Sequence, residues 1–382
     1  MDLSFEQGPI RPPSEARSLL IRVTRNCPWN KCAFCRTYQR EKFSLRSVEE
    51  VKEDITRARR IADEIRALSW KLGEAGRITE AVVRRIYHGG NGYNDAFRSV
   101  CAWLYWGGES VFLQDANSLI LKTEELEEIL TFLREQFPGV TRITSYCRSQ
   151  TARRKTVEEL QRLRQAGLSR IHVGMESGYD PLLEFIRKGA TAADHIEGGK
   201  RIVESGISLC EYIIPGLGGD RWSEENALAT ATVINAINPD YVRLRSLQVV
   251  KGTGLYELMQ KGEFTPLGDD ETVKEIRMFI ANLEGIQTTI VSDHILNLLE
   301  EVEGKLPEDK DKLLAVIDSY LSLPIQDRMI FRLGRRQGIY RRLDDLRDPV
   351  MYGRLKTITD EYLPDDTERF ETDLRHLMYQ YV

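Results

Sequence analysis

Six short apolar runs along the chain have the length and composition of buried parallel strands. They are SLLIRVT at 18–24, SVFLQ at 110–114, RITSYC at 142–147, RIHVGM at 170–175, LCEYII at 209–214 and YVRLRSLQVV at 241–250. From the second run onward a helical pattern follows, as after the capping box of Thr156 and Glu159. The strands start about every 30–38 residues, which is the length of a βαβ unit. The pattern predicts an α/β fold, a partial (β/α)6 barrel that is two units short of a TIM barrel.

The connection between the first and second runs is much longer than the others, at about 90 residues. A capping box of Ser47 and Glu50 opens a long amphipathic helix in it. Residues 79–88 and 94–106 have the pattern of two more helices, separated by GGNG. We therefore expect a helical insertion at about 52–108.

After residue 260 the strand pattern fades and the remaining residues look helical. We expect three parts along the chain. They are an N-terminal extension at 1–16, a barrel core at 17–260 and a helical C-terminal domain at 261–382.

The charge and hydropathy of the chain restrict its class. A net charge of −5 argues against bulk nucleic-acid binding, and no DNA partner is expected. No apolar run approaches the roughly 18 residues of a membrane helix. The start, MDLSFEQGPIRPPSEAR, is acidic and contains proline, unlike a signal peptide. We expect a cytoplasmic protein, in which a tight cysteine cluster indicates metal or redox chemistry.

Three of the six cysteines, Cys27, Cys32 and Cys35, lie in one short stretch directly after the first predicted strand. In a βα barrel, the carboxyl ends of the strands line the active site. Three thiolates can bind three irons of a 4Fe–4S cluster and leave the fourth iron open for a substrate or cosubstrate. A structural zinc site is the alternative, but the sequence offers no second Cys or His pair at zinc spacing.

These residues resemble the signature of the radical S-adenosylmethionine (radical SAM) enzymes, Cys-x3-Cys-x-aromatic-Cys. Cys32-Ala33-Phe34-Cys35 matches its second half, with Phe34 as the aromatic residue that packs near adenine. The first spacing differs, because CPWNKC has four intervening residues. The resemblance covers roughly residues 17–255 and leaves the subfamily open. It implies the partial barrel of that family, an oxygen-sensitive 4Fe–4S cluster on the three cysteines, and S-adenosyl-L-methionine (SAM) as the second cofactor.

The resemblance also implies contacts to SAM. The segment IHVGMESGYDPLLEFIRKG at 171–189 looks like the fourth-strand segment of the family. It assigns Glu176, followed by Ser177, to the ribose hydroxyls and Lys188 to the methionyl carboxylate. The alternative for Glu176 is a cap of the next helix.

Two further segments resemble strand ends of the family. EYIIPGLGGD at 211–220 looks like its Gly-rich turn, in which Gly216 and Gly218 would approach SAM closely, although a tight turn alone also explains the glycines. LQVVKGTGLY at 247–256 looks like the sixth-strand end, where the backbone of Val250 would meet adenine.

The second and third strand ends match the family less well. Relatives carry Gly-Gly-Glu after the second strand, but here GGE at 107–109 precedes it and is expected to be a turn. Asp115 and Asn117, which follow the strand, are the candidates for binding the SAM amino group. Cys147 ends the third strand, where it could donate hydrogen to a substrate radical or be a buried, inert thiol.

The resemblance predicts an enzyme that cleaves SAM reductively and abstracts hydrogen from an unidentified, small or partly apolar substrate, with an electron donor such as ferredoxin or flavodoxin. One alternative is a non-catalytic relative that binds haem or a cluster for trafficking. The other is an RNA-modifying radical SAM enzyme, for which FRLGRRQGIYRR at 331–342 is a locally basic segment.

The predicted insertion is rich in aromatic residues, including Trp103, Tyr105 and Trp106. Both of its ends are expected on the cluster side of the barrel. We therefore consider a lid that shields the radical, with Trp106 in contact with substrate. The alternative is that the aromatic residues pack on the C-terminal helical region.

Overall fold

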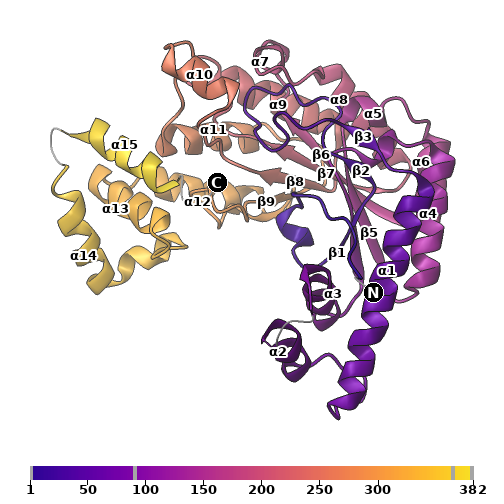
Figure 1. Ribbon diagram of the computed structural model, residues 1–382. Helices are drawn as coiled ribbons and strands as arrows, with labels where there is room; N and C mark the ends of the chain where they lie inside the picture. The colour runs from indigo at the N-terminus through magenta and orange to yellow at the C-terminus, as the bar shows by residue number, and fades with distance from the viewer. Residues whose placement is uncertain (1–2, 89–92, 363–365, 379–382) are drawn as a thin grey trace. The chain divides into compact units, whose positions relative to one another are not determined.

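The computed structural model describes residues 3–88, 93–362 and 366–378 (Figure 1). The strands are β1 Leu19–Arg22, β2 Thr24–Arg25, β3 Ser44–Leu45, β4 Ser110–Gln114, β5 Arg142–Cys147, β6 Leu168–Glu176, β7 Ser208–Ile213, β8 Tyr241–Leu244, β9 Thr289–Val291 and β10 Gly304–Lys305. The helices are α1 Val48–Lys71, α2 Glu80–His88, α3 Asp95–Tyr105, α4 Thr123–Gln136, α5 Ser149–Ala152, α6 Val157–Ala166, α7 Asp180–Phe185, α8 Ala192–Glu204, α9 Ser223–Ile237, α10 Gly254–Gln260, α11 Asp269–Ala281, α12 Lys310–Leu321, α13 Ile325–Arg336, α14 Pro349–Thr359 and α15 Thr367–Met378. The predicted linker GGNG lies outside the described residues.

The chain divides into two compact units, which are described separately. The first contains Met1–Asn30, Thr37–Val173 and Arg201–Leu209, and the second contains the other segments, Lys31–Arg36, Gly174–Lys200 and Cys210–Val382. The strand order is β1-β4-β5-β6-β7-β8-β9-β10. All six predicted strands are present in this order, and the predicted α/β fold of the partial-barrel type is confirmed.

The first unit is built on parallel strands. Leu19 of β1 pairs with Val111 of β4, and Ser145 of β5 pairs with Ile171 of β6. The strand β4 is buried almost along its whole length, which explains its continuous apolar sequence. Helices α1, α4 and α6 are in contact in that order and cover these strands (Figure 1).

In the second unit, β7, β8 and β9 are parallel and β10 is antiparallel to β9. The strands β9 and β10 were not predicted, because three and two residues are too few to show a pattern. The strand β8 ends at Leu244, six residues before the predicted end at 250. Helix α11 contacts both α9 and α12.

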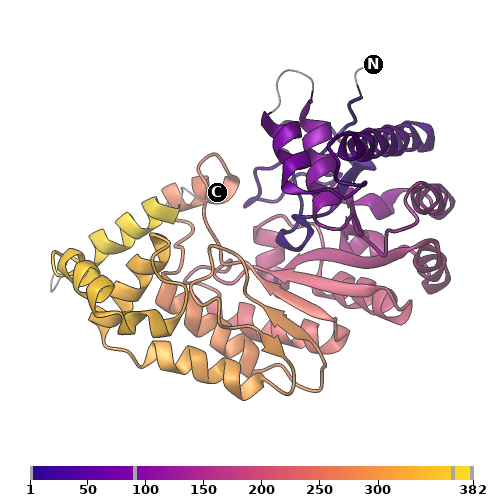
Figure 2. The ribbon, with the colours of Figure 1, turned by 90° about the horizontal axis from the view of Figure 1, so that it is seen from below.

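Three helices, α1, α2 and α3, lie in the long connection between β1 and β4. The capping box of Ser47 and Glu50 opens α1, where both hydrogen bonds of the box form. Helices α2 and α3 follow and pack on each other and on α1 (Figure 2). Trp103 of α3 is buried and packs edge-on against Phe137, with 5.1 Å between ring centroids.

The expectation that both ends of the insertion lie on the cluster side is wrong. The insertion returns to the sheet at the start of β4, and β4 is parallel to β1. Trp106 therefore lies near the beginning of β1, where the guanidinium of Arg17 stacks 3.7 Å from its ring. Cys27 follows the opposite end of β1, so within this unit Trp106 cannot act as a lid over the cysteine loop.

Candidate active site

The cysteine loop begins in the first unit with two left-handed residues. Asn26 and Asn30 have φ values of 67° and 47°, which asparagine tolerates better than most residues. The backbone N–H of Asn30 donates to Cys27 Sγ at 3.4 Å, and the Asn30 side chain donates to the Tyr38 carbonyl at 2.5 Å. Hydrogen bonds to a cysteine sulfur stabilise its negative charge, as a cluster ligand requires.

Residues 31–36 of the loop belong to the second unit. The N–H of Ala33 donates to the Ile186 carbonyl at 2.8 Å, and the Ala33 carbonyl accepts from Leu255 N at 2.8 Å. Ala33 lies in an apolar cluster with Leu182 and Leu255, and Phe34 packs against it. The segment that carries Cys32 and Cys35 is thus anchored by backbone bonds and by apolar packing.

The six cysteines differ in exposure. Cys27, Cys32 and Cys35 are half-buried and form no disulfide, whereas Cys101, Cys147 and Cys210 are buried. Burial raises the pKa of the Cys101 thiol to about 11, which keeps it protonated and inert. Cys147 Sγ lies 3.2 Å from the Arg148 carbonyl, to which it can donate. Only the first three, among the described cysteines, combine a shared loop with partial exposure.

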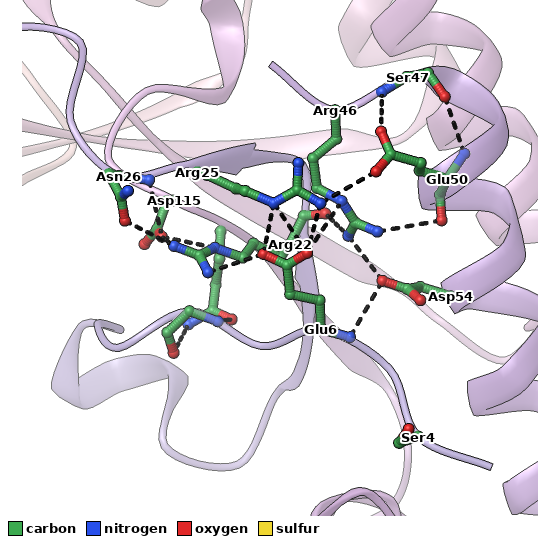
Figure 3. A network of polar contacts seen from close by, with 12 residues as sticks. Ser4, Glu6, Arg22, Arg25, Asn26, Arg46, Ser47, Glu50, Asp54 and Asp115 are labelled. Atoms are coloured by element: carbon green, nitrogen blue, oxygen red, sulfur yellow. Dashed lines mark hydrogen bonds and ion pairs between the residues drawn. The ribbon is translucent and has the colours of Figure 1, made fainter. Parts of the chain in front are cut away.

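Asp115 is bonded to both ends of the cysteine loop, and Figure 3 shows its contacts with Arg22 and Asn26. Its buried carboxylate accepts from Arg22 Nη2 at 2.7 Å, from Asn26 N at 3.4 Å and from the Tyr38 hydroxyl. Asn26 directly precedes Cys27, and Tyr38 is three residues after Cys35. Burial raises the pKa of Asp115, although the Tyr38 and Arg22 contacts oppose the shift. The role of Tyr38 was not predicted, because no local pattern links it to Asp115.

Glu6 extends this network into the N-terminal segment (Figure 3). Its carboxylate pairs with Arg22 at 2.9 Å, with Arg25 at 2.7 Å and with Arg46 at 3.6 Å. Burial alone would raise the pKa of Glu6, but the hydrogen bond from Arg25 and the charges of Arg46, Arg25 and Arg22 lower it. The segment predicted as an extension is therefore bonded to the residues that flank the cysteine loop.

Asn117, the second candidate for the SAM amino group, has partners within its own unit. Its side chain donates to Thr151 Oγ1 at 2.8 Å and accepts from Arg148 N at 3.2 Å. These bonds connect the end of β4 to the start of α5. Asn117 is buried, as is Cys147 at the end of β5.

In the second unit, Glu176 and Lys188 form a pair. Lys188 Nζ lies 2.8 Å from Glu176 Oε1, and both side chains are about seven-eighths buried, with exposures of 13% and 12%. Glu176 has a φ of 68°. A Cβ on Gly174 would lie 2.3 Å from Glu176 Oε1, so a larger residue at position 174 would collide with the ion pair. Glu176 does not cap α7, which begins after Tyr179 and has no side-chain cap.

Glu211 is a residue of this site that sequence analysis left without a role. It lies in β7 and is fully buried, and neither of its carboxylate oxygens has a hydrogen-bond partner among the described residues. Burial raises its pKa well above the ordinary value, the nearby charge of Lys188 opposes this, and the charge of Glu176 adds to it. The sequence feature that could have identified Glu211 is a single acidic residue within the apolar run LCEYII.

The Gly-rich turn follows β7. Gly216 has a φ of +83°, and its N–H donates to Glu275 Oε1 at 2.9 Å. A Cβ on Gly218 would lie 2.8 Å from the Trp222 carbonyl, so the packing of the turn itself requires this glycine. Ser177 donates to Asn226 Oδ1 at 2.6 Å. The Val250 carbonyl accepts from Thr253 Oγ1 at 2.7 Å.

Comparison with known proteins defines the class of this chain. Residues 103–231 match the sequence model of the Radical SAM superfamily. The predicted resemblance is confirmed over this segment, which is similar to enzymes that use a 4Fe–4S cluster and SAM. No helix among the described residues is long and apolar enough to cross a membrane.

More specific relatives match only part of the chain. The tRNA uridine(34) acetyltransferase of Methanocaldococcus jannaschii is 27% identical over 120 residues, which are 31% of this chain and 22% of that protein. An uncharacterized protein of the same organism is 31% identical over 113 residues, which are 30% of this chain and 34% of that protein. The solved structure of Methanocaldococcus infernus Elp3 with an N-terminal deletion covers 48% of each chain, with 18% identity and a TM-score of 0.39. The chain thus spans less than two thirds of these relatives.

The residues present suit both cofactors of the superfamily. The cysteine loop offers three half-buried thiols that form no disulfide, which is the donor set of a cluster with one open iron. The Glu176–Lys188 pair offers an acceptor and a donor of charged hydrogen bonds, and Glu211 offers a carboxyl without a partner among the described residues.

Proposed function

We propose that the chain binds a 4Fe–4S cluster through Cys27, Cys32 and Cys35, binds SAM beside it, and abstracts hydrogen from a small or partly apolar substrate. When bound, the two cofactors would supply reductive cleavage of the SAM C5′–S bond and a 5′-deoxyadenosyl radical. The observation that carries this proposal is the single loop with three half-buried cysteines outside any disulfide, whose two ends are both bonded to Asp115.

The protein would orient SAM through the second unit. Glu176 would accept hydrogen bonds from the ribose hydroxyls, and Lys188 would leave its pair with Glu176 to meet the methionyl carboxylate. Phe34 and the backbone at Val250 would pack near adenine, and Gly216 and Ser177 would bring the two strand ends close to the ligand. Such preorganised contacts hold the reacting atoms and exclude water.

The proposed contacts to the SAM amino group come from the first unit. Asp115 and Asn117 are our proposed partners of the SAM amino group, and both already have polar partners, so binding would share or displace those bonds. Cys147 is our proposed hydrogen donor to a substrate radical. A ferredoxin or flavodoxin is the proposed electron donor, and the cytoplasm the proposed location.

Iron analysis after anaerobic reconstitution tests the cluster ligands. We expect wild-type protein to bind about four irons and four sulfides. Cys32→Ala should lose the open-site cluster spectrum, while Cys210→Ala, a buried cysteine outside the loop, should retain it. A Cys32→Ala protein with wild-type iron content and spectra would contradict the assignment.

Product analysis tests the activity. With dithionite and SAM, reconstituted protein should form 5′-deoxyadenosine, which chromatography detects. A full cluster and bound SAM without 5′-deoxyadenosine under several reductants would favour the trafficking alternative instead.

A second candidate is RNA modification. Relatives that match part of the chain are named tRNA uridine(34) acetyltransferases, and this supports RNA as the substrate class. Incubation of reconstituted protein with tRNA and SAM, followed by nucleoside mass spectrometry, tests it. A nucleoside of altered mass that requires both SAM and reductant supports the candidate, and unchanged nucleosides alongside 5′-deoxyadenosine formation oppose it.

A further inference from the structure

A buried carboxylate on α11 connects the two strand ends to which SAM binding is assigned. Glu275 Oε1 accepts from Gly216 N at 2.9 Å and from Asn226 Nδ2 at 2.8 Å, and Glu275 Oε2 accepts from Ser223 Oγ at 2.7 Å. The residue is 4% exposed. All three of these partners are uncharged, and each donates to the carboxylate.

The same network continues to the end of β6. Asn226, which donates to Glu275, also accepts from Ser177 Oγ at 2.6 Å, and Ser177 Oγ accepts from Tyr179 N at 3.0 Å. Gly178 N donates to Thr230 Oγ1 at 2.9 Å. A Cβ on Gly178 would lie 2.5 Å from the Ala229 carbonyl, so the backbone at this point packs directly on α9. The network therefore fixes the residues that immediately follow Glu176.

We propose that Glu275 is a positioning residue for SAM binding, acting through Gly216 on one strand end and through Asn226 and Ser177 on the other. The inference rests on the proposed function. It places a determinant of the site on α11, beyond the segment 103–231 that matches the superfamily. The bonded oxygens need not carry a charge to hold these donors, because an amide oxygen in the same place accepts from Gly216 and Asn226 equally well.

Burial supports this assignment. It raises the pKa of Glu275 to about 7, although the bonds from Gly216, Ser223 and Asn226 oppose the shift. Burying a carboxyl without a charged partner costs desolvation free energy. An apolar side chain of similar size would fill the same space without that cost, so packing alone does not explain a glutamate here. Its three donors would be left unpaired without it, and two of them lie at or next to the proposed SAM-binding turns.

The experiment compares three substitutions on one helix. SAM affinity is measured by anaerobic calorimetry on reconstituted protein, with iron content and melting temperature measured on the same samples. Glu275→Gln keeps the shape and the acceptor, and should bind SAM within about twofold of wild type. Glu275→Leu fills the space without an acceptor, and should bind SAM at least about tenfold more weakly with unchanged iron content. Glu271→Leu, an exposed position on the same helix, is the control and should bind normally.

If Glu275→Leu binds SAM as wild type does, the inference is wrong. If wild-type protein with a full cluster binds no SAM, the proposed function fails instead. Should Glu275→Leu not fold, Asn226→Ala removes the connection between Glu275 and Ser177 and leaves the bonds of Glu275 to Gly216 and Ser223 in place. Wild-type SAM affinity in that variant would overturn the inference.

Discussion

At the scale of single residues, the site depends on buried acids whose partners lie far away in the sequence. Asp115 was a candidate for the SAM amino group because of its place after β4. The structure shows that its oxygens accept from Arg22 and Tyr38. A carboxylate that satisfies buried donors at both ends of a loop holds that loop, since removing it leaves those donors unpaired.

Asp115→Asn should loosen the cysteine loop. The amide loses the charge that pairs with Arg22, and only one of its two polar atoms accepts hydrogen bonds. We expect a loss of about 1–3 kcal/mol in the free energy of unfolding and faster loss of iron to a chelator. Asp63→Asn, an exposed aspartate of α1, is the matched control. Equal iron-loss rates in the two variants would exclude this role for Asp115.

Glu211 should make stability depend on pH. Its pKa in the folded protein is raised by burial, so the folded state holds a proton that the unfolded state releases above its ordinary pKa, near 4.5. Stability from this group is present below pH 4.5 and decreases as pH rises toward the folded pKa. Glu211→Gln should therefore gain melting temperature relative to wild type between pH 5 and pH 8.

The control for this prediction is Glu184→Gln, at an exposed position of α7. It should change the melting temperature equally at both pH values. A wild-type pH profile in Glu211→Gln would mean that Glu211 keeps its charge in the folded protein, and that Lys188 compensates for its burial.

At the scale of elements, the sequence predicts what depends on local patterns. The six parallel strands and the helices with capping boxes at Ser47 and Thr156 follow from periodicity and from capping chemistry. The strand β9 could not be found, because its pairing with β8 depends on chain segments about 50 residues apart rather than on its three residues. The partners of Glu6, Asp115 and Glu275 are likewise tertiary contacts that no local pattern contains.

The lid hypothesis failed for a reason of topology. A connection between two parallel strands begins at the carboxyl end of the first and must finish at the amino end of the next. The insertion between β1 and β4 therefore cannot return to the cluster side, whatever aromatic residues it carries. Trp103 and Trp106 differ strongly in burial, with exposures of 3% and 52%.

Substitution of these two tryptophans should lower the free energy of unfolding by very different amounts. Trp103→Ala should cost about 3–5 kcal/mol, because it empties a buried site against Phe137. Trp106→Ala should cost less than about 1 kcal/mol, because the side chain is half exposed and only its contacts with Arg17 and the neighbouring Tyr105 ring are lost. Chemical denaturation measures both, and product analysis should show that Trp106→Ala leaves the ratio of product to 5′-deoxyadenosine unchanged. A changed ratio would revive the lid.

At the scale of the whole molecule, the basic segment 331–342 bears on the RNA candidate. Most of its arginines are used inside the protein. Arg332 bonds to Asp269 at 3.2 Å and to Glu371 at 2.5 Å, and Arg336 bonds to Asp269 at 2.5 Å. Arg335 donates to the carbonyls of residues 297, 298 and 340. Three of the five arginines in this locally basic segment therefore form buried ion pairs or hydrogen bonds to carbonyls within the protein.

Of the five arginines in this segment only Arg341 and Arg342 are exposed, and Arg341 lies 3.2 Å from Glu300. Two exposed arginines on a chain with a net charge of −5 release few counterions on binding a phosphate backbone. If the protein modifies RNA, we therefore expect the RNA to be held elsewhere. The segment should instead contribute to stability.

Two variants separate these roles. Arg336→Gln should lower the free energy of unfolding by about 3 kcal/mol, because it breaks a buried pair with Asp269, although Arg332 still faces that carboxylate. The double variant Arg341→Gln with Arg342→Gln should unfold like wild type, and the salt dependence of any tRNA retention should be unchanged. A shallower salt slope in the double variant would show that residues 341–342 do contact RNA phosphates, because each lost contact reduces the slope by about one unit.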